Sequence, residues 1–159
     1  AVAFVWRISK PAVAVPTIPI YPKELKSFVN AYEEKRKTTL ELESIERQVK
    51  KGKIPRRQYK VRRRTLESRL AVLSRELATL REKIRMVGAR YSDMMRQIEV
   101  AEAETQAAEA EIRRTEVRYR RGETPASVYR ELLESSYKRR ERAKTTIDGV
   151  LLRLREDIS

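Results

Sequence analysis

The sequence predicts an all-α protein with the shape of an elongated rod. Three observations lead to this fold class. Charged residues make up 38% of the 159 residues, with only 4 Gly and 2 Phe, a composition that favours long charged helices over a sandwich, barrel or wound sheet. Apolar residues recur every three or four positions from residue 66 to residue 119. Two short segments containing Gly and Pro are the only breaks after residue 22.

Residues 1–22 differ from the rest of the chain. Apolar side chains alternate with other residues at the start, as in a short strand: Val2, Phe4, Trp6 and Ile8. An extended, non-helical path is then imposed by Pro11, Pro16, Pro19 and Pro22. Because this segment is too apolar for a flexible linker, we expect it to lie against its own helices or a partner chain. We therefore divide the chain into this extended segment, 1–22, and a helical rod, 23–159.

Two turns of the same design divide the rod into helices. Their shared spacing is Gly52, Pro55 and Tyr59 in the first turn and Gly122, Pro125 and Tyr129 seventy residues later. Glycine suits the left-handed position that ends a helix, and proline suits the first position of the next one. We expect helices over 23–51, 55–120 and 125–157. The matching turns also indicate an internal repeat, in which each copy is a helical hairpin.

The middle helix carries the clearest periodicity. Its apolar positions alternate spacings of four and three without a slip, which is typical of a left-handed coiled coil. A helix over 55–120 would be about 95–100 Å long at 1.5 Å per residue. Gly88 either allows close packing or marks a bend, and we favour close packing. We expect an oligomerisation seam at Leu66, Leu70, Leu73, Leu77, Leu80, Ile84, Val87, Tyr91, Met94 and Ile98.

The lengths of the helices predict their arrangement. The first and third helices fold back as antiparallel hairpins that lie end to end along the central helix and approach each other near Gly88. Folding about the second turn sets one group of acidic residues opposite one group of basic residues: Glu99, Glu102, Glu104, Glu109 and Glu111 opposite Lys138, Arg139, Arg140, Arg142 and Lys144. Folding about the first turn sets Glu41, Glu43 and Glu46 opposite Arg62, Arg63 and Arg64. Because a two-stranded rod shields its seam incompletely, we predict at least a homodimer.

The composition also limits the chemistry. The chain has no His and no Cys, which excludes disulfides, thiol catalysis, Cys/His metal sites and acid–base catalysis by His. We therefore expect no enzymatic activity and no cofactor.

The net charge of +14 favours a polyanionic partner such as DNA or anionic lipid. Six cations at the first turn lack obvious acidic partners and form the candidate polyanion site, with a merely solvated tip as the alternative: Lys50, Lys51, Lys53, Arg56, Arg57 and Lys60.

No signal peptide or membrane-spanning segment is apparent, because prolines interrupt the apolar N-terminus. The lack of Cys agrees with a cytoplasmic protein. Since the chain begins with Ala1 rather than Met, we expect it to be a piece of a longer protein.

The paired hairpins resemble the CdvA family of archaeal cell-division proteins over roughly residues 22–158. The resemblance rests on two turns of the form Gly-x-Ile-Pro followed by Tyr: Gly52-Lys53-Ile54-Pro55 with Tyr59, and Gly122-Glu123-Thr124-Pro125 with Tyr129. Thr124 departs from the family pattern. The resemblance implies a filament-forming scaffold at the mid-cell division site, associated with DNA and membrane. It also implies recruitment of the ESCRT-III-like partner CdvB by a C-terminal peptide, which we expect to lie beyond Ser159. It further implies an N-terminal β-barrel, which we expect to be missing here unless the strand-like segment Val2–Ile8 is its last strand.

Three functions compete. We favour a self-assembling coiled-coil scaffold of the division machinery. The second is a DNA-binding protein without sequence specificity, whose rod presents basic tips. The third is an ESCRT-III-like membrane-remodelling polymer. Binding to DNA but not to anionic liposomes would favour the second, and tubulation of liposomes would favour the third.

Overall fold

The structure, a computed structural model, describes residues 22–158 and contains four helices over that range. They are α1 (Pro22–Lys50), α2 (Arg56–Arg85), α3 (Ala89–Arg120) and α4 (Ala126–Ile158). The predicted all-α class is confirmed for the described part of the chain. The strand and proline-rich path expected before residue 22 lie outside the described residues.

The predicted continuous helix over 55–120 is wrong, and so is the count of three helices. The chain leaves the helix after Arg85 and enters α3 at Ala89, so Met86, Val87 and Gly88 form a bend. Gly88 has extended backbone angles, φ 161° and ψ 173°. Close packing at this glycine is also wrong, because a Cβ atom built on Gly88 would have no neighbour within 4 Å. The periodicity continues through the bend because both sides pack apolar side chains. The part in α2 packs mainly against α1, and the part in α3 packs mainly against α4.

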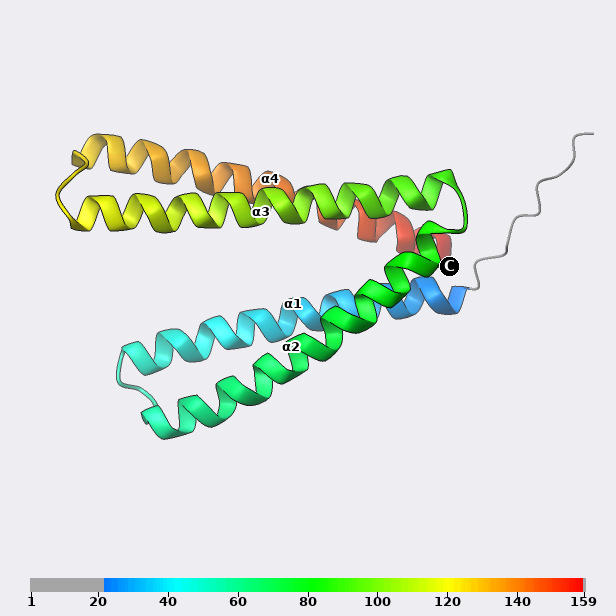
Figure 1. Ribbon diagram of the computed structural model, residues 1–159, viewed down its shortest axis with the longest axis horizontal. Coiled ribbons are helices and arrows are strands. Elements are labelled where there is room, and N and C mark those ends of the chain that lie inside the picture. Colours follow the sequence, from blue (N-terminus) through cyan, green and yellow to red (C-terminus); the bar gives the residue numbers. More distant parts are fainter. Residues whose placement is uncertain (1–21, 159) are drawn as a thin grey trace, which may run out of the picture.

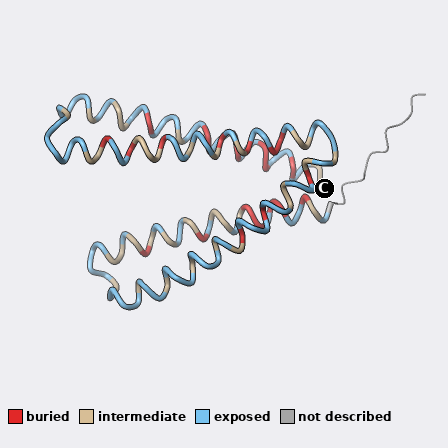
Figure 2. Tube along the Cα trace, viewed as in Figure 1, coloured by how far each residue is buried: buried red, intermediate tan, exposed pale blue. Residues whose placement is uncertain are grey.

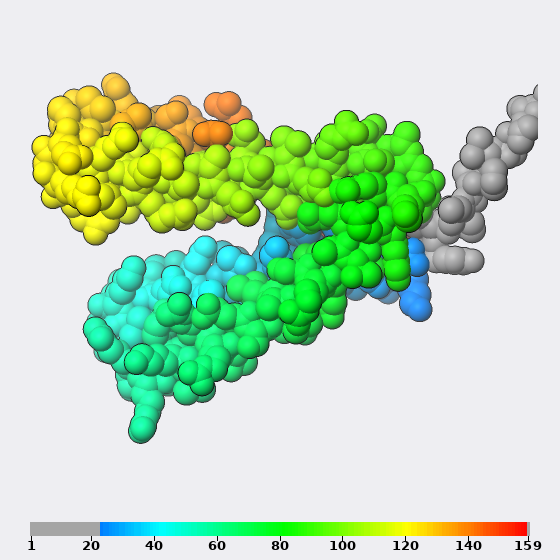
Figure 3. Space-filling view, in the orientation of Figure 1, coloured from blue at the N-terminus to red at the C-terminus, as the bar shows by residue number. Residues whose placement is uncertain are grey.

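The bend places the two hairpins side by side, which corrects the end-to-end arrangement. Figure 1 shows α1 antiparallel to α2 and α3 antiparallel to α4, with both turns pointing the same way. Near the bend, α1 contacts α4 and α2 contacts α3. Toward the turns the hairpins diverge, and Figure 3 shows open space between them. The molecule is thus a V with a four-helix base and two arms, the first formed by α1 and α2 and the second by α3 and α4.

The main hydrophobic core lies in the base, where buried residues concentrate in Figure 2. All four helices contribute to it. The members are Leu25, Phe28, Val29, Ala31 and Tyr32 of α1, Leu73, Leu77 and Ile84 of α2, Met94, Met95, Ile98 and Ala101 of α3, and Ala143, Ile147, Val150, Leu151 and Leu154 of α4. Two hairpins that each expose an apolar stripe therefore cover each other, as a layered fold requires.

The two turns have the same backbone hydrogen bonds. Gly52 and Gly122 have positive φ angles of 73° and 74°. In the first turn the Lys53 amide donates to the Gln48 carbonyl at 2.9 Å, and in the second the Glu123 amide donates to the Arg118 carbonyl at 3.0 Å. These bonds span five residues across a left-handed glycine, which is the Schellman ending of a helix. The repeat seen in the sequence is therefore also a repeat in the structure.

Candidate functional site

The first tip, at the turn between α1 and α2, carries the strongest unneutralised charge. All six cations of the candidate polyanion site are exposed, and none of them forms an ion pair or side-chain hydrogen bond within the described residues: Lys50, Lys51, Lys53, Arg56, Arg57 and Lys60. The hairpin turn brings the end of α1 and the start of α2 together, so the six charges gather at one end of the first arm. Such a cluster suits phosphate groups, which bind basic side chains without base readout.

The second tip has the same backbone and a different charge. Residues seventy positions after the six cations are Arg120, Arg121, Glu123, Ala126, Ser127 and Arg130. Three arginines and one glutamate give a formal charge of +2, against +6 at the first tip. The rings of Tyr119 and Tyr129 stack at the second tip, with centroids 4.0 Å apart and planes 11° apart. The polyanion candidate is therefore a property of one repeat.

Basic residues just beyond the first tip are partly neutralised. Arg62 pairs with Glu41 across the hairpin at 3.2 Å, as expected. Arg63 pairs with Glu67 of its own helix at 2.8 Å instead of with α1. The nearby charge of Glu67 and its hydrogen bond raise the pKa of the Arg63 guanidinium. Arg64, which was expected to face acidic residues of α1, forms no ion pair within the described residues, so unpaired cations continue from the tip into the start of α2.

The ten seam positions divide between the base and the first arm. Leu73, Leu77, Ile84, Met94 and Ile98 are buried in the base. Partial exposure is seen at the others: Leu66, Leu70, Leu80, Val87 and Tyr91. In this structure the seam thus faces the chain's own helices, and the residues of α2 and α3 that were expected on one straight stripe belong to two hairpins.

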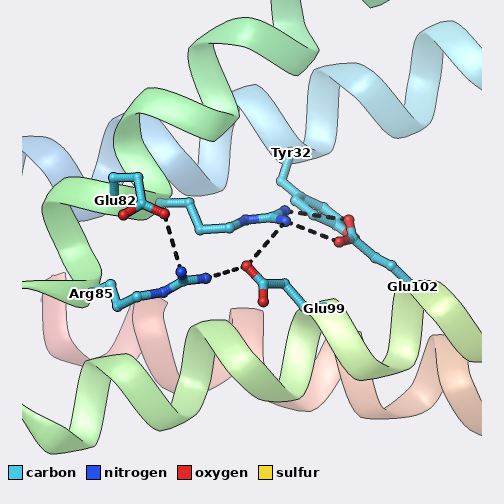
Figure 4. A network of polar contacts seen from close by, with 6 residues as sticks. Tyr32, Glu82, Arg85, Glu99 and Glu102 are labelled. Carbon is cyan, nitrogen blue, oxygen red and sulfur yellow. Dashed lines mark hydrogen bonds and ion pairs between the residues drawn. The ribbon is translucent and has the colours of Figure 1, made fainter.

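A polar network fastens α1, α2 and α3 at the base (Figure 4). The Tyr32 hydroxyl donates to Glu102 at 2.9 Å, and Arg81 donates to both oxygens of the same carboxylate at 3.1 and 3.4 Å. Arg85 pairs with Glu99 and, at 3.1 Å, with Glu82. Burial and the neighbouring Glu102 carboxylate raise the pKa of Tyr32 well above its usual value. These contacts join the two hairpins directly.

The other side of the base joins α1 to α4. Arg36 pairs with Asp148 at 2.5 Å, and Arg155 pairs with Glu33. Near the bend, the Tyr91 hydroxyl donates to Asp157 at 2.9 Å, and burial together with this bond raises the pKa of Tyr91. Sequence reasoning missed these partners, since no local spacing relates residues that lie 66 to 122 positions apart.

The expected charge pairing within the second hairpin is found in part. Arg139 pairs with Glu104 at 2.7 Å, and this bond raises the pKa of the Arg139 guanidinium. The equivalent residues of the first hairpin, Arg69 and Glu34, pair in the same way. The expectation fails for Glu99 and Glu102, which bind arginines of α2. It also fails for two lysines and one glutamate, which pair on their own helices: Lys138 with Glu134, Lys144 with Glu141, and Glu111 with Arg114.

The described residues hold no group of three or more acidic side chains suited to a metal ion. Among the same residues, no helix is long and apolar enough to cross a membrane. The arrangement offers two binding features, a cationic tip and helix faces along the arms and base.

Comparison with known protein families gives no match to this chain. Comparison of its sequence with curated proteins likewise finds no relative.

Proposed function

We propose that this chain is a non-enzymatic, self-assembling coiled-coil scaffold. The observation that carries the proposal is the incomplete cover of the first arm. Leu40 and Val61 are each 62% exposed. They lie at the same level of the arm, because their chain neighbours Glu41 and Arg62 form an ion pair. Seam residues Leu66 and Leu70 are also only partly buried. Association with another helix would remove this apolar surface from water.

The resemblance to the CdvA family supplies the biological setting of the proposal. In that setting the chain forms filaments at the division site of an archaeal cell and helps recruit ESCRT-III-like proteins such as CdvB. The paired turns that carry the resemblance are both well formed, each with a left-handed glycine followed by proline. Recruitment would use the C-terminal peptide that the resemblance implies.

Sedimentation velocity over a concentration series tests the scaffold proposal. We expect a mass that rises above 18.7 kDa with concentration. The double variant Leu40→Ser/Val61→Ser should weaken this association. Val100→Ser/Leu152→Ser is the matched control, because these residues are 56% and 55% exposed on the other hairpin. A compact monomer at every concentration would exclude the scaffold.

The cationic first tip favours a second candidate function, which is binding to a polyanion without sequence specificity. This second function rests on a different observation from the scaffold: six exposed cations without partners in the described residues gather at one turn. DNA and anionic lipid both offer the phosphate groups that such a tip would bind. The scaffold and the tip can operate in one molecule, because the tip lies at the end of the arm and leaves its sides free.

A further inference from the structure

The apolar periodicity of the sequence does not stop at the bend. Leu77, Leu80, Ile84, Val87, Tyr91, Met94 and Ile98 keep the alternating spacing of three and four from α2 into α3. A bend evolved only to reverse the chain needs no such register, since the helices on its two sides would pack independently. A single straight helix through residues 86–88 would instead place all seven residues on one stripe. The sequence of α2 and α3 is therefore compatible with two conformations.

The change between the two conformations is confined to a short segment. Met86 still has a helical backbone, with φ −75° and ψ −9°, and the Val87 amide donates to the Ile84 carbonyl at 3.2 Å. The Gly88 carbonyl already accepts the first hydrogen bond of α3, from Ser92 at 3.0 Å. A helical backbone at the bend would thus join α2 to α3. Short hinge segments favour the exchange of identical elements between copies of a protein.

The contacts that hold the V closed do not depend on the bend. Each hairpin is a copy of the other, and the contact of α1 with α4 is the repeat-equivalent of the contact of α3 with α2. The fastening pairs, Arg81 with Glu102 and Arg36 with Asp148, each join one hairpin to the other. The second hairpin of another copy presents the same partners to the first hairpin. An open chain can therefore recover every base contact from a second open chain.

We propose that two copies of this chain exchange hairpins to form an antiparallel dimer. In each copy α2, the bend and α3 become one continuous helix, and the first hairpin of one copy packs on the second hairpin of the other. Two four-helix bases result, related by a two-fold axis that passes between the two bends. The contact is closed, since both copies use the same surfaces. This proposal rests on the self-assembly proposed above and names its first step.

Two substitutions at neighbouring residues should shift the equilibrium between the closed monomer and the exchanged dimer in opposite directions. Gly88→Ala has room in the closed form, where a Cβ meets nothing within 4 Å, and alanine favours the continuous helix. We expect it to tighten the dimer roughly 25-fold, because two bends become helical in each dimer and each contributes a factor of about five. Ala89→Pro suits the closed form, because residue 89 is exposed, begins α3 and follows an extended residue. It should weaken the dimer at least about a thousandfold, because proline disrupts a helix interior.

Sedimentation equilibrium of the full chain and both variants measures these constants. The order Gly88→Ala tightest, unaltered chain next and Ala89→Pro weakest is the expected result. If the unaltered chain and Ala89→Pro associate equally well, hairpin exchange is wrong while self-assembly stands. If none of the three associates, both proposals fail.

A mixing experiment tests the exchange without altering the bend. Arg81→Glu alone and Glu102→Arg alone each set like charges against each other within one closed chain. In an exchanged dimer of one copy of each, both bases again hold one acidic and one basic residue at these positions. Mixing the two variants should produce a 1:1 dimer that neither forms alone, detected with a mass tag on one of them. Failure to form that mixed dimer overturns the exchange.

Discussion

Tyr32 and Glu102 occupy the same position in the two repeats and are hydrogen-bonded to each other. The Tyr32 hydroxyl lies 2.9 Å from the Glu102 carboxylate, and the residue numbers differ by seventy, the offset that relates the two turns. Equivalent positions can meet only near a two-fold axis between the hairpins. The base of the V is therefore an approximately symmetric interface within one chain, with different residues on its two sides.

This contact predicts a stability that depends on pH in the alkaline range. The pKa of Tyr32 is raised in the folded chain, so the folded state keeps a proton that the unfolded state releases above about pH 10. Stability is then fully present below pH 10 and falls as the pH rises, by up to about 1.4 kcal/mol per pH unit from this group. Denaturant unfolding of the unaltered chain and Tyr32→Phe between pH 9 and pH 11.5 measures the difference. Equal slopes in the two proteins would contradict it.

Shortening an apolar side chain to alanine should lower the stability of the protein far more in the base than in the first arm. Leu77 is 2% exposed in the four-helix core, and Leu77→Ala should cost about 2–5 kcal/mol in the free energy of unfolding. Leu66 belongs to the same periodic stripe but is only partly buried in the first arm. Leu66→Ala should therefore cost about 1 kcal/mol. Urea denaturation followed by circular dichroism gives both values, and equal losses would show that the arm is as tightly packed as the base.

The two turn glycines should respond alike to alanine. Gly52 and Gly122 have φ near +74°, where a Cβ atom is strained, so each change to alanine should destabilise the chain by about 1 kcal/mol. Gly149 is the control because it lies inside α4, and a Cβ there meets nothing within 4 Å. Gly149→Ala should stabilise the chain by up to about 1 kcal/mol. Thermal unfolding should show a lower melting temperature for the two turn variants and a higher one for Gly149→Ala.

Charge reversal at the first tip should weaken binding to polyanions without unfolding the chain. Arg56→Glu/Arg57→Glu changes two exposed residues that have no ion partner in the described structure. If all six cations neutralise phosphates, the logarithm of affinity for duplex DNA should fall with the logarithm of salt concentration with a slope of about −5. The double variant should flatten that slope by about 2.

The second tip supplies the control for this experiment. Arg120→Glu/Arg121→Glu reverses two charges at the positions equivalent to Lys50 and Lys51, on the tip with the lower net charge. We expect this variant to reduce polyanion binding less than Arg56→Glu/Arg57→Glu does. Parallel measurements with vesicles containing anionic lipid distinguish DNA from lipid as the preferred ligand. A salt slope that the first-tip variant leaves unchanged would remove this tip as the binding site.

The turns and the outer helices could be predicted because their signals are local. Glycine at a left-handed position and proline at the start of a helix are consequences of backbone sterics, so they mark the same boundaries in any fold. The predicted ranges 23–51 and 125–157 agree with α1 and α4 to within a residue.

The bend and the base could not be predicted because their causes are not local. A periodic stripe states which residues avoid water, but it does not state which helix covers them. Val87 fits the stripe whether the chain continues straight or reverses. Glu102 was expected to face α4, yet it binds Tyr32 and Arg81, because the reversal brings α1 and α2 against α3. Sequence reasoning could have found this contact only by comparing equivalent positions of the repeats.

The backbone hydrogen bonds of the two turns have an evolutionary consequence. The two turn sequences, Lys-Gly-Lys-Ile-Pro and Arg-Gly-Glu-Thr-Pro, share only the glycine and the proline, yet they form the same hydrogen bonds. The other side chains of the turn are therefore not needed for this geometry. After duplication of an ancestral hairpin, selection could therefore alter the charge of one end while the architecture stayed constant. The first tip with its charge of +6 and the second with its charge of +2 are the divergence that such freedom allows.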